Sequence, residues 1–336
     1  MLDGAREAVA AGIGVQADEI VLTSGGTESV ALGLVGAAIA GRDRGDRVIV
    51  SAVEHPAVMG TAAFLESIGF RSIPVPVDGH GRLDVDRFAA EVRAPGTVVA
   101  SVQHANQEVG TIQPVAEAAD VARAAGVPFH TDACQTVGRL GVDAAALGVD
   151  LLSLSGRKFG GPPGIGALYV RRGLPFTGFP RGDDRERHRR SGAPNLPGAA
   201  AMAAVLDAAR EEMADQAAHH WALTGHLRAA IEDRIAGARL HGHPTQRTPH
   251  LACFSVEGID PEVLLLALDE RGFHLDGGSV ASGSPHEPSQ VLAAMGVPDT
   301  VALRAGVGPE TTEHDIDRFV DALQDLVTNL ARLRAT

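Results

Sequence analysis

The sequence predicts an α/β protein in which a mostly parallel sheet with helices on both faces is followed by a smaller α+β domain. Between about residues 19 and 170, short runs of strand-favouring residues alternate with alanine-rich stretches of helical character. Such alternation is typical of a parallel sheet covered by helices. Toward the C-terminus the pattern changes to one long helical stretch and a few mixed elements. We therefore predict a large domain over 1–205 and a small domain over 206–336.

The large domain contains six strand candidates, at 19–24, 47–53, 96–103, 127–133, 150–156 and 165–172. A polar stretch rich in Pro, Gly and Arg follows over 173–198, and helical sequence then extends from about Gly198 to Ala236. The small domain combines the remaining candidates, which are strands at 250–258 and 301–308, a helix at 261–272 and a final amphipathic helix.

Composition excludes several classes of protein. The 336 residues, 45% of them hydrophobic, suffice for a large and a smaller core. The apolar stretch from Val30 to Gly41 is far short of the roughly 20 residues that a membrane span needs. The N-terminus lacks the basic start and long hydrophobic region of a signal peptide. We therefore expect a cytoplasmic protein without a membrane partner.

Charge and cysteine content argue against nucleic-acid and metal binding. The net charge of −13 disfavours a broad phosphate-binding surface. The one basic cluster, at 181–190, is interrupted by acids and a histidine, which indicates a solvated loop or an anion contact. Cys134 and Cys253 cannot form a disulfide framework and fit no zinc spacing. We expect no metal site.

The stretch TSGGTESVALGL, from Thr23 to Leu34, carries a strand through a Ser-Gly-Gly-Thr turn into a helix. Free backbone N–H groups and the helix dipole make such a turn an anion site, with the Thr27 hydroxyl as a further donor. Ser and Thr are also ordinary helix caps, so capping alone is the alternative.

The stretch FHTDACQTVG places Asp132 and Gln135 near the end of a strand. Ligands of open α/β sheets bind at the carboxyl ends of the strands. A carboxylate there could hold a protonated ring nitrogen, or it could cap a helix.

Lys158 follows an apolar strand and precedes a turn rich in Gly and Pro. Partial desolvation lowers the pKa of a lysine and makes it a candidate imine-forming amine. The alternative is an exposed loop lysine. The GxG fragments after it lead into a strand, so they are not a dinucleotide fingerprint.

Together with EHPAV at 54–58 and HANQEVGTIQP at 104–114, these motifs resemble the class V aminotransferase group of pyridoxal phosphate (PLP) enzymes, and within it the cysteine desulfurases of the NifS/IscS type. The resemblance extends over nearly the whole chain, and the block SGRKFGGPPGIGALYVRR is its most specific part. It implies PLP-transferase fold type I with a seven-stranded sheet, PLP as cofactor, and residues 1–205 as the PLP-binding domain without the family's further N-terminal segment.

The resemblance also implies roles for individual residues. Lys158 would form the internal aldimine and move protons at the substrate Cα. Asp132 would pair with the pyridinium nitrogen, so that the ring acts as an electron sink. Gln135 would donate to the phenolic oxygen. His55 would stack on the ring and assist proton transfer, with a packed surface histidine as the alternative.

The phosphate and the substrate would bind at further positions. Gly26, Thr27 and Ser155 match phosphate contacts, and Arg157, where the family usually has a histidine, could also contact phosphate. Arg304 matches the arginine that receives the substrate α-carboxylate, a task suited to a bidentate donor. Gln107 replaces an asparagine and would reach the cofactor or substrate differently.

Two positions lack a functional group that the family uses. Ala193 replaces a threonine that contacts phosphate across the dimer. Counting back from EPS, the catalytic cysteine of the family falls at Ala281. A methyl group can neither attack sulfur nor carry a persulfide, because that step requires a thiolate. Val280 and Gly283 differ as well, which favours natural divergence over a single engineered change.

We therefore predict a PLP-dependent enzyme of the cysteine desulfurase family that acts on L-cysteine or a related small amino acid. One alternative is a C–S lyase or aminotransferase that needs no thiol. Another is a non-catalytic PLP-binding or scaffold homologue. The resemblance further implies a homodimer and allows a sulfur-acceptor protein as partner.

Overall fold

The structure is a computed structural model that describes residues 1–278, 289–297 and 301–334. The chain separates into two compact units. The first consists of Met1–Val77, Leu83–Ala105 and Gln113–Met213. The second consists of Asp78–Arg82, Asn106–Ile112 and Ala214–Thr336. The domain division at residues 205 and 206 stays a prediction.

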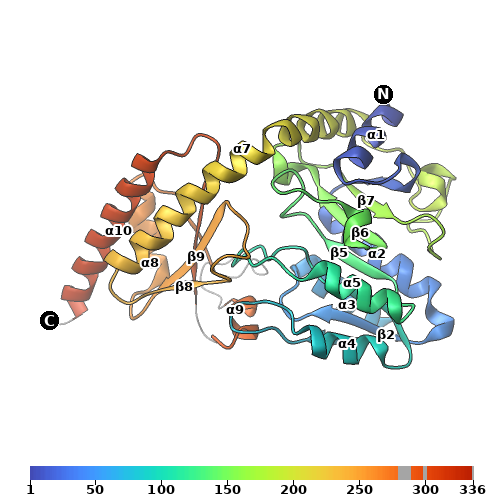
Figure 1. Ribbon diagram of the computed structural model, residues 1–336, viewed down its shortest axis with the longest axis horizontal. Helices are drawn as coiled ribbons and strands as arrows, with labels where there is room; N and C mark the ends of the chain where they lie inside the picture. Colours follow the sequence, from blue (N-terminus) through green and yellow to red (C-terminus); the bar gives the residue numbers. More distant parts are fainter. Residues whose placement is uncertain (279–288, 298–300, 335–336) are drawn as a thin grey trace. The chain divides into compact units, whose positions relative to one another are not determined.

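The first unit is built on a seven-stranded sheet with the order β1-β7-β6-β5-β4-β2-β3 (Figure 1). β7 is antiparallel to β1 and β6, and the other neighbouring pairs are parallel. This confirms the predicted mostly parallel sheet. The bounds are β1 Ile20–Thr23, β2 Arg47–Ser51, β3 Arg71–Val75, β4 Thr97–Ser101, β5 Phe129–Asp132, β6 Leu151–Ser155 and β7 Gly166–Val170.

Strand β3 is the one strand of this sheet that the sequence candidates did not include. It lies at the sheet edge beside β2. Of its five residues only Val75 is buried, and Pro74 lies in the middle of the pairing with β2. An edge strand tolerates proline and polar residues, so it carries no apolar run for a sequence search to find.

Helices cover both faces of the sheet (Figure 1), as predicted. The side chains alternate between the two cores, since Ile20 and Leu22 of β1 belong to one and Val21 belongs to the other. The first core is covered by α1 (Leu2–Gly12), α4 (Val85–Arg93), α5 (Val115–Ala124), α6 (Ala144–Leu147) and the first part of α7 (Leu196–Arg234). The second core is covered by α2 (Gly26–Ala40) and α3 (Pro56–Ser67).

The second unit contains a four-stranded antiparallel sheet with the order β10-β11-β9-β8. Its core includes Phe254, Leu268, Phe319 and side chains from the later part of α7. The elements are β8 Ala238–His241, β9 Leu251–Val256, α8 Pro261–Asp269, β10 Asp276–Gly277, α9 Gln290–Ala294, β11 Leu303–Gly306 and α10 Glu313–Arg334. Short 3₁₀ helices η1 to η4 occupy Ala17–Glu19, Arg42–Arg44, Gly156–Phe159 and Arg185–His188 in the first unit.

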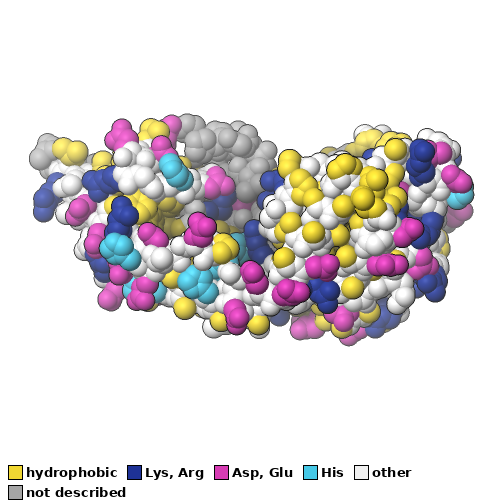
Figure 2. Space-filling view, turned by 90° about the horizontal axis from the view of Figure 1, so that it is seen from above, with side chains coloured by type: hydrophobic (Ala, Val, Ile, Leu, Met, Phe, Trp, Pro, Cys, Tyr) yellow, Lys and Arg dark blue, Asp and Glu magenta, His cyan; other side chains and the backbone are white. Residues whose placement is uncertain are grey.

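Local sequence signals explain where several helices begin. In α3, Pro56 occupies the first turn, where its missing N–H leaves no bond unmade, and His55 caps the helix. In α8, Asp260 accepts the N–H of Glu262 and Pro261 follows it. The described residues include no helix with both the length and the apolar character of a membrane span. On the face shown in Figure 2, described Lys and Arg side chains lie scattered among acidic ones.

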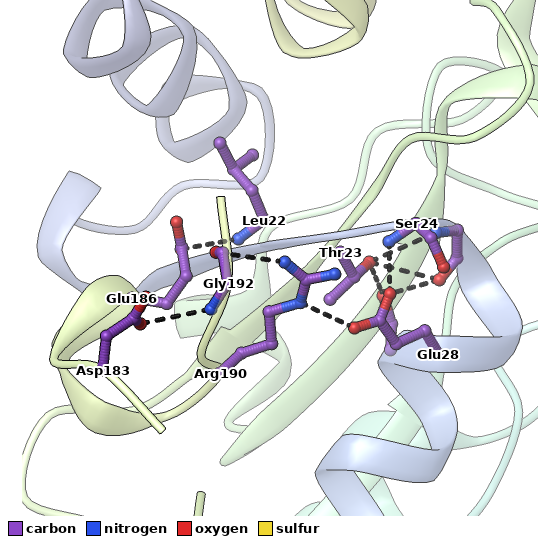
Figure 3. A network of polar contacts seen from close by, with 10 residues as sticks. Leu22, Thr23, Ser24, Glu28, Asp183, Glu186, Arg190 and Gly192 are labelled. Atoms are coloured by element: carbon purple, nitrogen blue, oxygen red, sulfur yellow. Dashed lines mark hydrogen bonds and ion pairs between the residues drawn. The ribbon is translucent and has the colours of Figure 1, made fainter. Parts of the chain in front are cut away.

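The segment 183–192 of the first unit is strained and anchored (Figure 3). Glu186, Arg187 and His188 have φ angles of 49°, 55° and 62°, a left-handed run that non-glycine residues avoid. The buried Glu186 carboxylate accepts two hydrogen bonds from Arg6 and a third, at 2.8 Å, from the N–H of Leu22. The expectation of a solvated loop is therefore wrong for Glu186.

Candidate active site

Most of the candidate residues of the first unit lie where strands end at one edge of the sheet. Asp132 and Ser155 are the last residues of β5 and β6. Gly26 begins α2 after β1, and His55 caps α3 after β2. Because β1, β2, β5 and β6 point in the same direction, the structure brings these residues to the carboxyl edge of the sheet.

The Ser-Gly-Gly-Thr turn packs tightly against the neighbouring strand ends. A Cβ atom on Gly26 would lie 2.5 Å from Sγ of Cys134 and 3.3 Å from Cβ of Ser155. Helix α2 begins after Gly25 without a side-chain cap, so the alternative that Ser or Thr of this turn only caps the helix is wrong. The first turn of α2 therefore has no side-chain acceptor on its N-cap residue, as a site for a bound anion requires.

Asp132 and Gln135 are oriented by contacts within their own turn. The Asp132 side chain is buried and its Oδ1 accepts the N–H of Cys134 at 2.9 Å, closing a turn rather than capping a described helix. The Gln135 Oε1 accepts from Arg139 Nη1 at 3.1 Å. Its amide N–H₂ group is then available as a donor.

Lys158 lies in η3, directly after β6, and is half-buried. Burial lowers its pKa, and the guanidinium groups of Arg157 and Arg139 lower it further. An exposed loop lysine is therefore wrong as the alternative. Lys158 is also the only lysine in the chain, because the 29 Lys and Arg residues comprise 28 arginines and this one lysine. Arg157 is exposed.

His55 is half-buried and its imidazole orientation is fixed. Its Nδ1 accepts the N–H of Ala57 at 3.0 Å, which places the ring hydrogen of the neutral form on Nε2. Burial lowers the pKa of His55, although Asp132 opposes this. The positive charges of Lys158 and Arg157 lower the pKa further, so the neutral imidazole is favoured.

Neither cysteine is activated as a nucleophile. Burial raises the pKa of Cys134 well above its usual range, and Asp132 adds to the effect. Burial raises the pKa of Cys253, a buried residue of β9, to about 12. The thiolate form is disfavoured at both positions. Ala281, the position that the family fills with a cysteine, lies outside the described residues, and Ala193 is exposed.

Gln107 and Arg304 belong to the second unit. The Gln107 side chain is buried, and among the described residues neither its Oε1 nor its Nε2 has a hydrogen-bond partner. Such an amide usually marks the place of a ligand or water. Arg304 is buried on β11, where Nη1 donates to Gly278 O at 2.8 Å and Nη2 lies 2.6 Å from Oδ2 of Asp276. Glu108 Oε2 lies 4.0 Å from Nη1.

Glu54 is a residue of this region that the sequence reasoning missed. It stands immediately before His55, yet only 4% of it is exposed. The signal was present in the EHPAV motif, where an acid occupies the end of an apolar run. A buried carboxyl group without a cationic partner is uncommon enough to need an explanation.

A family model described as Aminotransferase class-V matches residues 1–319. The chain belongs to this family. The cysteine desulfurase IscS of Methanosarcina thermophila is 38% identical over 332 residues, which cover 98% of this chain and 82% of the relative. A solved NifS-like protein is 31% identical with a TM-score of 0.89, covering 97% of this chain and 87% of that chain.

The apo structure of the cysteine desulfurase from Thermococcus onnurineus NA1 is 23% identical and matches with a TM-score of 0.86, covering 98% of this chain and 84% of that one. It supports the fold. Class V aminotransferases and their cysteine desulfurase members are PLP-dependent enzymes, so PLP is the cofactor of this family member. The resemblance predicted from the motifs is thereby confirmed.

The residues of the first unit fit PLP. Lys158 supplies the single ε-amine, with a lowered pKa that favours its neutral, nucleophilic form. Asp132 supplies a buried carboxylate suited to a protonated ring nitrogen. The start of α2, packed closely at Gly26 and without a side-chain cap, suits the phosphate.

Proposed function

We propose that this protein is an enzyme of the cysteine desulfurase type that acts on L-cysteine or a related small amino acid, with PLP attached to Lys158. The observation that carries the proposal is the half-buried position of the only lysine in the chain. Its pKa is lowered, and it follows β6 at the edge of the sheet where β5 ends with Asp132. The substrate class is proposed because the similar proteins are cysteine desulfurases.

The proposed chemistry divides between the cofactor and the chain. Bound PLP supplies an electron sink for the charge that develops at the substrate Cα. Asp132 holds the proton on the ring nitrogen, and Gln135 donates its amide N–H to the phenolic oxygen. Lys158 accepts and returns the proton at Cα, since its lowered pKa favours the neutral amine more than in an ordinary lysine.

The remaining contacts position the cofactor. The first-turn N–H groups of α2 at Gly26, together with the hydroxyls of Thr27 and Ser155, bind the phosphate dianion. The exposed guanidinium of Arg157 adds a further, charge-assisted contact. The neutral imidazole of His55 would stack on the cofactor ring.

Two further residues are proposed as substrate contacts. We assign Arg304 to the α-carboxylate and Gln107, whose buried amide has no partner among the described residues, to the cofactor or substrate. Because Asp276 already holds one edge of the Arg304 guanidinium, the substrate carboxylate replaces Asp276 when it binds. We also propose a homodimer, with a sulfur-acceptor protein as partner if sulfur is released to one.

The identity of the product decides how sulfur leaves. Ala281 supplies no thiol. The pKa values of Cys134 and Cys253, both of which lie in the described part of the chain, are raised. Neither cysteine is therefore an activated acceptor for a sulfur atom removed from the substrate. Alanine together with the persulfide of an added thiol, from which a second thiol molecule releases sulfide as the disulfide forms, would support desulfuration. Pyruvate with ammonia would instead support elimination by a C–S lyase, and a keto acid with aminated cofactor would support an aminotransferase.

The test of the cofactor site uses the unique lysine. Purified protein is incubated with PLP, reduced with borohydride and digested, and the peptide that carries the added mass is identified. We expect one label per chain, on Lys158, and no labelled peptide from Lys158→Ala. A label confined to the α-amino group would overturn the proposal. If the PLP-loaded protein turns over no amino acid, the alternative of a non-catalytic homologue is supported.

A further inference from the structure

Glu54 has no role in the chemistry proposed above, although its carboxyl group lies in the same region. Its Oε1 accepts the N–H of Gln103 at 2.8 Å. Its Oε2 is buried and, among the described residues, has no hydrogen-bond partner. An ionised carboxylate in this state would forgo most of its solvation, which costs several kcal/mol unless the group becomes neutral.

Glu54 ties together the loops after two neighbouring strands. It follows β2, whereas Gln103 follows β4, and the Gln103 amide Nε2 donates back to the carbonyl of Val53. The next strand, β5, ends with Asp132, whose carbonyl accepts the N–H of His104 at 2.8 Å. Hydrogen bonds therefore join the loop after β2 to the loop after β4, and the loop after β4 to the end of β5. Glu54 and Asp132 are the residues of this network that carry carboxyl groups.

The charged group that acts on Glu54 is Asp132 at the end of β5, while His55 follows Glu54 directly in the chain. No cation of the described residues forms an ion pair with Glu54, and the negative charge of Asp132 acts on it. Burial, with Asp132 as the second cause, raises the pKa of Glu54 to about 8. Two nearby carboxyl groups cannot both ionise easily, so Glu54, which has one buried oxygen without a donor among the described residues, keeps its proton.

We propose that Glu54 is a positioning acid of the active site: as a neutral group it holds the His55 loop and leaves Asp132 as the single negative charge of the pair available to the cofactor ring, and its ionisation makes the site doubly negative. The proposal rests on the proposed function, because the ring belongs to that site. A second negative charge would stabilise nearby cations, including the protonated forms of Lys158 and of the ring nitrogen.

The consequence is a coupled titration in the alkaline range. When Glu54 and the cofactor site interact strongly, neither loses its proton independently of the other. The absorbance of the bound cofactor should therefore change over a broadened pH range in the wild type. In Glu54→Gln, which keeps the shape and removes the charge, we expect one sharper transition with a midpoint about one pH unit lower.

The experiment records the absorbance of the PLP-loaded protein between pH 6 and pH 10 for the wild type, Glu54→Gln and Glu54→Asp. Glu54→Asp retains an ionisable group and should retain the broad transition. Glu117→Gln, an exposed glutamate on α5, is the matched control and should follow the wild type. Infrared spectroscopy of the protein without cofactor gives a second reading, since a protonated carboxyl band at neutral pH should disappear in Glu54→Gln.

The outcomes are distinct. Identical cofactor titrations in the wild type and Glu54→Gln would overturn the proposal, as would the absence of a Glu54-dependent carboxyl band. If Glu54→Gln does not fold, a wild-type titration with a single sharp step and no protonated carboxyl band would overturn it equally. Failure of the wild type to attach PLP at Lys158 would instead contradict the proposed function, while the infrared result would still report on Glu54.

Discussion

Replacing Glu186 by Gln tests whether the buried ion pair with Arg6 holds the strained segment 183–192. The two side chains are only 9% and 1% exposed, with Glu186 the more buried. Both carboxylate oxygens are used, because Arg6 binds both and the N–H of Leu22 binds one as well. The substitution leaves the Arg6 charge buried without a full counter-charge.

The expected loss of stability follows from this geometry. Breaking a buried pair by changing one partner costs about 3–5 kcal/mol. The anchor also maintains three consecutive left-handed residues, each unfavourable by roughly 1–2 kcal/mol outside such a context. A domain of about 150–250 residues changes its melting temperature by about 2–4 °C per kcal/mol, so we expect a decrease of roughly 6–20 °C.

Two assays check this expectation. Thermal and urea unfolding report the loss of stability, and limited trypsin digestion reports release of the segment through faster cleavage after Arg187 and Arg189. Arg185→Gln is the control, because its pair with Asp183 is exposed and should contribute little. A double replacement, Arg6→Met with Glu186→Leu, should recover much of the loss. A decrease below about 1 kcal/mol with unchanged cleavage would refute the reasoning.

Three further predictions concern the active site. Gly26→Ala should weaken PLP binding at least tenfold, as measured by fluorescence titration, because its Cβ atom would lie 2.5 Å from a neighbouring sulfur; Gly60→Ala, in open space, should bind normally. Asp276→Asn should lower the spectroscopic dissociation constant for L-alanine a few-fold by freeing Arg304, and an unchanged constant would contradict the proposed exchange of carboxylates. Glu54→Gln should gain stability relative to the wild type as pH rises from about 4.5 to about 8. In that window the raised pKa of Glu54 in the folded state costs the wild type up to about 1.4 kcal/mol of unfolding free energy per pH unit. Parallel curves of unfolding free energy against pH for the two proteins would contradict this.

Much of the first sheet could be predicted because its strands are buried on both faces and therefore appear as continuous apolar runs. Strand β3 could not, since an edge strand with Arg71 and Pro74 exposed has no such run. Likewise, a lysine after an apolar strand indicates where Lys158 lies, but its half-burial depends on neighbours from other elements.

Features that depend on pairing between distant parts of the chain could not be predicted at all. Glu186 lies 180 positions from Arg6, and in sequence it is one charge within a polar stretch. The partner of Arg304 depends on the β10–β11 register, which places Asp276 directly opposite. The burial of Glu54 depends on the loop after β4, where the N–H of Gln103 donates a hydrogen bond to its carboxyl group.

The single, half-buried lysine has a consequence for how this protein can be chemically modified. Any acyl group that reaches a lysine side chain of this protein, by enzyme or by spontaneous transfer, must arrive at Lys158. Its lowered pKa makes the amine more reactive near neutral pH than an ordinary surface lysine. Acylation there would remove the amine needed for the proposed chemistry, and a bound cofactor would protect it. Acetylation and loss of activity would therefore be the same event in this chain.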